Sequence, residues 1–227
     1  MKIIRILLFC SIASALHAQN NSGDFFAAQI APGAQAQLKT LLDNPAMIQP
    51  AVAAPLGKNW FRLETDAHVF TDQASVKQVA AVLLDWENQE KYLNGKRSIL
   101  SATVVSRNGN NSVVDFVSTS FAPMGIRIRT PYRADITTYE NSDTRFYVEM
   151  KQSGSDSASN DRLKELLATR YAQAVTIDGK QYTYIRIYII NDVNGSILPG
   201  ARGVLENQSG PANIEALQLI IAAAKTK

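Results

Sequence analysis

The sequence predicts an α+β fold in which a long antiparallel sheet is followed by one C-terminal helix. β-Prone segments follow one another over most of the chain after residue 98, whereas regular alternation of strands and helices would indicate a parallel sheet. Two pairs of these segments are joined by Asn108-Gly109 and Asp178-Gly179, dipeptides that tight hairpin turns prefer. After the last strand, apolar residues recur at helical spacing along one face: Ile214, Leu217, Ile220 and Ile221.

The predicted sheet begins with an extended segment over residues 60–70, and a helix follows it. Ser75 can cap this helix, because its hydroxyl can accept a hydrogen bond from a backbone N–H of the first turn. From Val76 onward, apolar residues recur at i, i+3, i+4 and i+7, which is the pattern of a helix with one buried face. We expect this helix to end near Trp86 and a short helical turn to follow over residues 87–93.

Six further strands complete the predicted sheet, which then has about seven. Their β-branched and aromatic residues favour an extended backbone, and turn residues separate them. They are expected at residues 99–105, 113–121, 126–138, 145–152, 171–177 and 181–190. After a Ser-rich loop over residues 153–160, a short helix is expected at residues 162–170, because Leu163, Leu166 and Leu167 have helical spacing.

The first 18 residues have the pattern of a secretory signal peptide, because Lys2 and Arg5 precede an apolar run that ends in small residues. We expect cleavage after Ala18, with cleavage after Ala15 as the alternative. An uncleaved membrane anchor is the other interpretation, but the apolar run is shorter than the roughly 20 residues that span a bilayer core. The sequence therefore predicts export to the periplasm.

Two segments are expected to remain after cleavage. Residues 19–58 are rich in Ala, Gln, Asn and Pro, and they are expected to form a helical or spacer segment in which only residues 34–43 have a helical pattern. Residues 59–227 are expected to form the main domain, with the sheet and the last helix.

The composition argues against several kinds of site. Cys10 and His17 leave with the signal peptide, so the mature chain has no cysteine and His68 is its only histidine. Disulfides, thiolate nucleophiles and metal sites are therefore not expected, and neither is a cofactor or a catalytic residue. Loss of Lys2 and Arg5 brings the net charge from +3 to about +1, so nucleic-acid binding is not expected either.

The order of the elements and two short motifs resemble the START/SRPBCC superfamily. Residues 72–86, which end in Asp85-Trp86, and residues 88–93 resemble its first helix and the short turn with a tyrosine that follows. Residues 195–199 resemble a Gly-Ser-Leu-Pro element before its long last helix, and the resemblance covers roughly residues 60–225. It implies a helix-grip fold, in which a curved sheet wraps the C-terminal helix and leaves an internal cavity for lipids or other apolar small molecules.

The resemblance favours an exported, START-like binding protein over two alternatives. We expect this protein to bind a lipid or other apolar small molecule. Brief contact with a membrane would allow the protein to transfer this ligand. The first alternative is a cyclase- or dehydratase-like enzyme of the same superfamily, which would need a general acid or base inside the cavity. The second is a non-catalytic scaffold that acts through its surface.

Two orientations of the strand at residues 181–190 stay open. Tyr184, Arg186 and Tyr188 alternate with Ile185 and Ile187, so the two sets lie on opposite faces of the sheet. Half-buried antiparallel strands usually turn their polar face to water, which would place the isoleucines inward. In the inverted orientation, Arg186 would offer hydrogen-bond donors to a carboxylate or phosphate head group inside an apolar pocket.

Candidate ligand contacts follow from the same alternation. Phe116 is expected at the wall of the cavity, and Arg129 alternates with isoleucines as Arg186 does. His68 is expected to be a structural residue at the end of the first strand. The full candidate set is Phe116, Arg129, Tyr184, Arg186, Tyr188 and Leu217.

Overall fold

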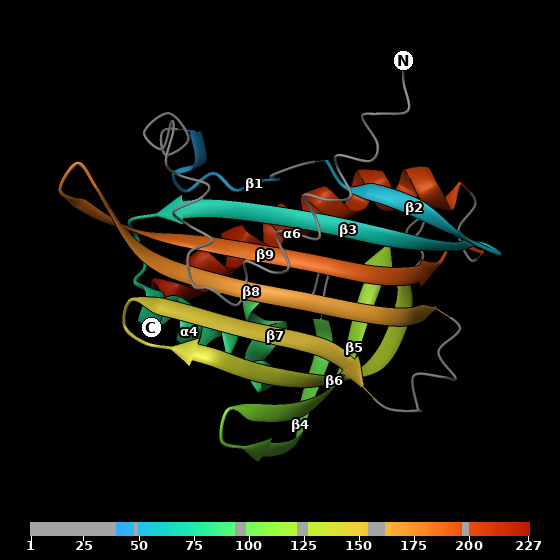
Figure 1. Ribbon diagram of the computed structural model, residues 1–227, viewed down its shortest axis with the longest axis horizontal. Coiled ribbons are helices and arrows are strands. Elements are labelled where there is room, and N and C mark those ends of the chain that lie inside the picture. Colours follow the sequence, from blue (N-terminus) through green and yellow to red (C-terminus); the bar gives the residue numbers. More distant parts are fainter. Residues whose placement is uncertain (1–39, 48–49, 94–98, 122–126, 154–161, 197–199) are drawn as a thin grey trace. The chain divides into compact units, whose positions relative to one another are not determined.

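The computed structural model describes residues 40–47, 50–93, 99–121, 127–153, 162–196 and 200–227, and Leu41–Lys227 forms one compact unit. In this part of the chain the predicted α+β class is confirmed, with a nine-stranded antiparallel sheet and a long C-terminal helix (Figure 1). The strands are β1 (Ala46–Met47), β2 (Val52–Gly57), β3 (Trp60–Thr71), β4 (Ile99–Asn108), β5 (Asn111–Phe121), β6 (Arg127–Asn141), β7 (Arg145–Ser153), β8 (Leu163–Ile177) and β9 (Lys180–Asn194). The helices are α4 (Val76–Leu83), α5 (Gln89–Tyr92) and α6 (Ala201–Ala224), with a 3-10 turn at Trp86–Asn88 between α4 and α5.

The strand order is β1-β3-β9-β8-β7-β6-β5-β4, and β2 also pairs with β3. From β4 to β9 each strand lies beside its neighbour in sequence, which is the order of an antiparallel meander. Asp178 and Gly179 both have positive φ, of 51° and 75°, so the hairpin predicted there is confirmed. In the other hairpin the two turn residues are Gly109 and Asn110, one position later than predicted, and the positive φ of 56° falls on Gly109.

The helix predicted at residues 162–170 is wrong, because these residues are the first half of β8. They pair with β9 on one side and β7 on the other, and this pairing outweighs their helical spacing. The three-residue spacing of Leu163 and Leu166 is explained by an irregularity in the strand. A bulge between Leu163 and Glu165 shifts the register, so Leu163 and Leu166, three residues apart, both face the same cavity.

Residues 46–57 add two strands that the sequence analysis does not predict. Both pair with β3, and Ala53 in β2 is fully buried. Pro55 is tolerated because β2 is at the edge of the sheet, where a missing backbone N–H disturbs no second neighbour. The predicted signal peptide and most of the helix predicted at residues 34–43 lie outside the described residues.

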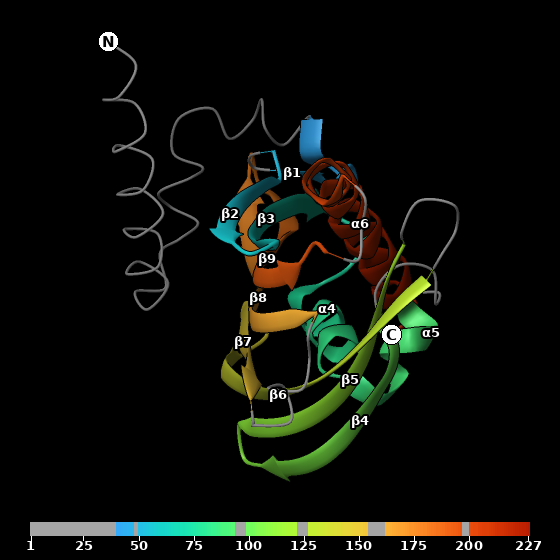
Figure 2. The same cartoon turned by 90° about the vertical axis from the view of Figure 1, so that its right-hand side faces the viewer.

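The three helices lie on the inner side of the bent sheet (Figure 2). Ser75 caps α4 as predicted: its hydroxyl accepts from the Gln78 backbone N–H at 3.3 Å, and the Gln78 side chain accepts from the Ser75 N–H at 2.9 Å. Trp86, Phe116 and Leu217 belong to one apolar core between these helices and the sheet. None of the described helices has the length and apolar character needed to cross a bilayer.

Candidate functional site

A cavity of about 310 Å³ lies between the inner face of the sheet and α6. This volume is at the lower end of the range of about 300–1,000 Å³ usual for small-molecule sites. Most of the wall is aliphatic, with side chains from both elements, among them Leu63, Leu166, Ile187 and Ile189 from the sheet and Ala216 and Ile220 from α6. Such a wall excludes water from an apolar ligand.

Ile187 and Ile189 of β9 line this cavity, so the first of the two predicted orientations is confirmed. Tyr184, Arg186 and Tyr188 therefore lie on the other face of the sheet, but they are not solvated as expected. Their exposed fractions are only 2%, 7% and 7%. This face of β9 is polar in composition and nevertheless buried.

Arg186 has its carboxylate partner within the protein. Its Nε and Nη2 atoms donate to the two carboxylate oxygens of Asp66, at 2.7 and 2.5 Å, and both side chains are more than 90% buried. Tyr188 donates its hydroxyl to Glu64 at 2.9 Å. The inverted orientation, with Arg186 in the cavity, is therefore wrong.

The other three candidates also lie outside the cavity wall. Phe116 is buried in the core, in edge contact with Trp86 at 5.9 Å between ring centroids and stacked on Tyr132 at 5.2 Å. Leu217 is fully buried on α6, and Arg129 is exposed on β6. None of the six candidates is among the residues that line the cavity, and their contact with a ligand stays a prediction.

Arg170, which the sequence analysis assigned to a helix, lines the cavity from β8. Its guanidinium carbon lies 5.0 Å from the ring centroid of Trp86, and Nη1 donates to Gln89 Oε1 at 3.3 Å. Burial lowers the pKa of Arg170 to about 10, against the opposing effect of Tyr132. Arg170 is therefore still positively charged at neutral pH.

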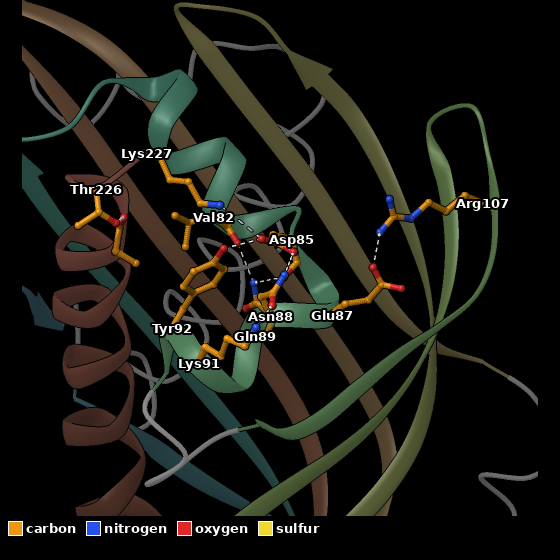
Figure 3. A network of polar contacts seen from close by, with 11 residues as sticks. Val82, Asp85, Glu87, Asn88, Gln89, Lys91, Tyr92, Arg107, Thr226 and Lys227 are labelled. Atoms are coloured by element: carbon orange, nitrogen blue, oxygen red, sulfur yellow. Dashed lines mark hydrogen bonds and ion pairs between the residues drawn. The ribbon is translucent and has the colours of Figure 1, made fainter.

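The orientation of Gln89 is fixed by the end of α4 (Figure 3). Its side-chain Nε2 donates to the backbone carbonyls of Val82, at 2.7 Å, and Asp85, at 3.3 Å. Because the nitrogen is committed to these two acceptors, the amide oxygen is left to accept from Arg170. Gln89 is 1% exposed, so this contact is sheltered from water.

The carboxylate of Asp85 connects this region to the C-terminus of the chain (Figure 3). It accepts hydrogen bonds from the Tyr92 hydroxyl and from Asn88 Nδ2, the latter at 2.8 Å, and Lys227 Nζ lies 3.5 Å away. Burial raises the pKa of Asp85, but the hydrogen bonds from Tyr92 and Asn88 and the charge of Lys227 together bring it below its ordinary value.

Replacing Asp85 by asparagine is expected to cost about 1–3 kcal/mol of unfolding free energy at neutral pH, since it removes the charge and leaves one acceptor oxygen for the donors of Asn88 and Tyr92. Because the folded-state pKa is lowered, the contribution of Asp85 is complete above its unfolded pKa of about 4 and is lost as the pH falls through the folded value. Urea unfolding of both proteins over an acidic pH series measures this. Asp143→Asn, which changes a carboxylate in an exposed ion pair, is the control with no expected effect. A D85N deficit that persists unchanged in acid would contradict this account.

Other polar groups also face the cavity. Burial raises the pKa of the Tyr132 hydroxyl to about 12, so it stays protonated and can donate a hydrogen bond. Thr119 Oγ1 and Asn191 Oδ1 are buried and make no hydrogen bond to the described residues. Asn213 Nδ2 on α6 donates to Thr65 Oγ1 on β3 at 2.6 Å, and both residues line the wall. The surface of the cavity is thus largely apolar, but nearly half of the residues that line it have polar side chains.

The wall contains no Asp, Glu, His or Cys among the described residues. Its ionisable side chains are Arg162, Arg170 and Tyr132. Within the same described ranges, no three His, Cys, Asp or Glu side chains gather closely enough to hold a metal ion.

A scan of the sequence against protein-family models found no match, and a search of curated proteins found none either. Solved structures do match. A STAR-related lipid transfer protein fragment from Xanthomonas axonopodis gives a TM-score of 0.53 at 10% identity, over 78% of this chain and 99% of that one. The Zhui aromatase/cyclase from a Streptomyces species gives 0.52 at 13% identity, over 72% and 93%. Human STARD10 gives 0.50 at 10% identity, over 77% and 73%.

At these identities the likeness shows the fold alone. At the level of architecture, the three structures bear out the resemblance to the START/SRPBCC superfamily that the sequence indicates. The chain therefore has the START-like helix-grip fold, an antiparallel sheet of nine strands, within the described residues, packed against a long C-terminal helix.

Proposed function

We propose that this chain is an exported protein that binds a lipid or other apolar small molecule in the cavity between the sheet and α6. The observation that carries the proposal is the aliphatic wall around a volume of about 310 Å³. Each Å² of apolar ligand surface removed from water there stabilises the complex by about 25 cal/mol before the costs of association.

Binding is favoured over catalysis by the chemistry of the wall. The fold alone does not distinguish the two, because one of the similar structures is named a lipid transfer protein and another an aromatase/cyclase. A general acid or base works best when its pKa lies near the operating pH. The pKa values of Arg170 and Tyr132 are about 10 and about 12, and no carboxylate or imidazole lines the described wall.

Export is supported by the first 18 residues, in which Lys2 and Arg5 precede a short apolar run. A periplasmic location also suits a carrier for a molecule that is poorly soluble in water, because both bilayers are then within reach for brief contact.

Native mass spectrometry of the protein purified from the periplasm of its own host tests both parts of the proposal. We expect the mass of residues 19–227 plus one bound apolar compound, which denaturing extraction then identifies. A mass that includes the first 18 residues would refute cleavage after Ala18. Protein that is repeatedly empty and does not take up fluorescent fatty acids would refute the binding function.

Replacing Ala216 by phenylalanine is expected to weaken the binding of a fluorescent fatty acid by about tenfold or more. Ala216 is on the cavity wall, so the added ring occupies the ligand's volume instead of overpacking the core. Ala222→Phe is the matched control, because Ala222 is on the same helix and exposed. Fluorescence titration measures the affinity, and thermal unfolding checks that both variants fold. Equal affinities for A216F and A222F would show that the ligand binds elsewhere.

A further inference from the structure

Arg170 differs from the other arginines that are tied into the sheet. Each of three other arginines forms an ion pair with an aspartate. Arg186 pairs with Asp66. In the pairs Arg62–Asp192 and Arg133–Asp115, Nε lies 2.8 and 2.6 Å from Oδ1, respectively. Arg170 has no carboxylate partner among the described residues, and the acceptor of its side-chain hydrogen bond is the neutral oxygen of Gln89. A guanidinium has five N–H donors, so most of those on Arg170 are left without a protein acceptor in the described part of the chain.

The described residues of the wall place no negative charge beside Arg170, because none of them is Asp or Glu. Removing a charge from water is costly unless an opposite charge or several hydrogen bonds compensate. An anion in the cavity would supply both.

The guanidinium is also held in place before any ligand arrives. One face of it lies over the Trp86 ring, and Gln89, itself fixed by two backbone carbonyls, accepts from Nη1. A preorganised donor group loses little side-chain entropy on binding, so more of the interaction contributes to affinity. The protonated Tyr132 hydroxyl and the Thr119 hydroxyl are further donors on the same wall.

We propose that the ligand is an amphipathic carboxylic acid, whose carboxylate is bound by Arg170 and whose apolar body lies against the aliphatic wall. This inference rests on the proposed function and specifies the class of its ligand. A planar carboxylate matches the two parallel N–H donors of an arginine. A cavity at the small end of the usual range suits one apolar body, such as a single acyl chain.

The test compares ligands that share an apolar body and differ in the head group. Dodecanoate and dodecanol are titrated into the mature protein against a displaceable fluorescent probe. Wild type is expected to bind dodecanoate about tenfold or more tighter than dodecanol, the difference that one charged hydrogen-bonded contact provides. Acetate, which has the head group without the body, is expected not to displace the probe.

Replacing Arg170 by methionine is expected to remove this preference. Dodecanoate affinity falls by about tenfold or more, whereas dodecanol affinity is unchanged. Arg170→Lys keeps the charge but loses the planar fork, so it retains only part of the preference and serves as the second variant if R170M does not fold. Arg107→Met is the matched control, because Arg107 is exposed on β4, away from the wall.

The outcomes separate this inference from the proposed function. If both compounds bind wild type equally, or if folded R170M and R170K keep the full acid preference, the carboxylate inference is wrong and apolar binding stands. If neither compound binds and the probe does not bind, both fail. Displacement by acetate at the concentrations that suffice for dodecanoate would overturn the inference by showing a simple anion site.

Discussion

Replacing Asp66 by alanine is expected to lower the free energy of unfolding by about 3–5 kcal/mol, because it removes the carboxylate of a buried, bidentate ion pair. Arg186 would keep its charge on a side chain that is 8% exposed, where water cannot replace the two lost hydrogen bonds. Most of this loss of stability is expected to come from the buried charge of Arg186 that is left unpaired, and less from the attraction between the two side chains. Urea unfolding at neutral pH measures it.

Two further variants test this explanation. Glu165→Ala breaks an ion pair with Arg62 in which Glu165 is 59% exposed, and its cost is expected to be less than about 1 kcal/mol. The double variant D66A/R186M removes both charges, so it is expected to recover much of the stability that D66A alone loses. If D66A is as stable as E165A, the ion pair contributes little to the fold. If the double variant is no more stable than D66A, the cost comes from lost packing.

The sequence predicts two local features of the backbone correctly. Ser75 and Gln78 form a capping box, and Asp178-Gly179 forms a hairpin turn, because these conformations depend on residues within the turn itself. At the start of β8, the three-residue spacing of Leu163 and Leu166 predicts a helix, and this prediction is wrong. A bulge gives the same spacing in a strand, and only the pairing with β9 distinguishes the two.

The site depended on which strands are neighbours, and this was harder to predict. Alternation alone placed Ile187 inward correctly. It could not show that Asp66 is beside Arg186, because that contact joins residues 120 positions apart through the pairing of β3 with β9. The sequence does not identify Arg170 as a cavity residue, because the helical spacing at the start of β8 hides the alternation of the strand. Had β8 been assigned as a strand from its start, alternation with Ala168 and Leu166 would have placed Arg170 on the wall with them.

Replacing Trp86 by alanine is expected to lower the free energy of unfolding by about 3–5 kcal/mol, as for other fully buried large aromatic residues. Trp86 is 2% exposed and contacts Phe116 in an edge-to-face arrangement. Trp60, the other tryptophan, is the matched control, because it is half-buried at the start of β3 with Lys164 Nζ 4.2 Å from its ring centroid. W60A is expected to cost about 1 kcal/mol, the size of an exposed cation–π contact.

Trp86 links the stability of the core to recognition at the site, since Arg170 rests on its ring. Trp86→Phe keeps an aromatic face of smaller area, so it should lose part of the stability and retain most of the preference for an acid over the matching alcohol. W86A should lose much of that preference, because the guanidinium would no longer be held on one side. Urea unfolding and the dodecanoate and dodecanol titrations measure the two effects separately. A folded W86A with the full acid preference would mean that Gln89 alone positions Arg170.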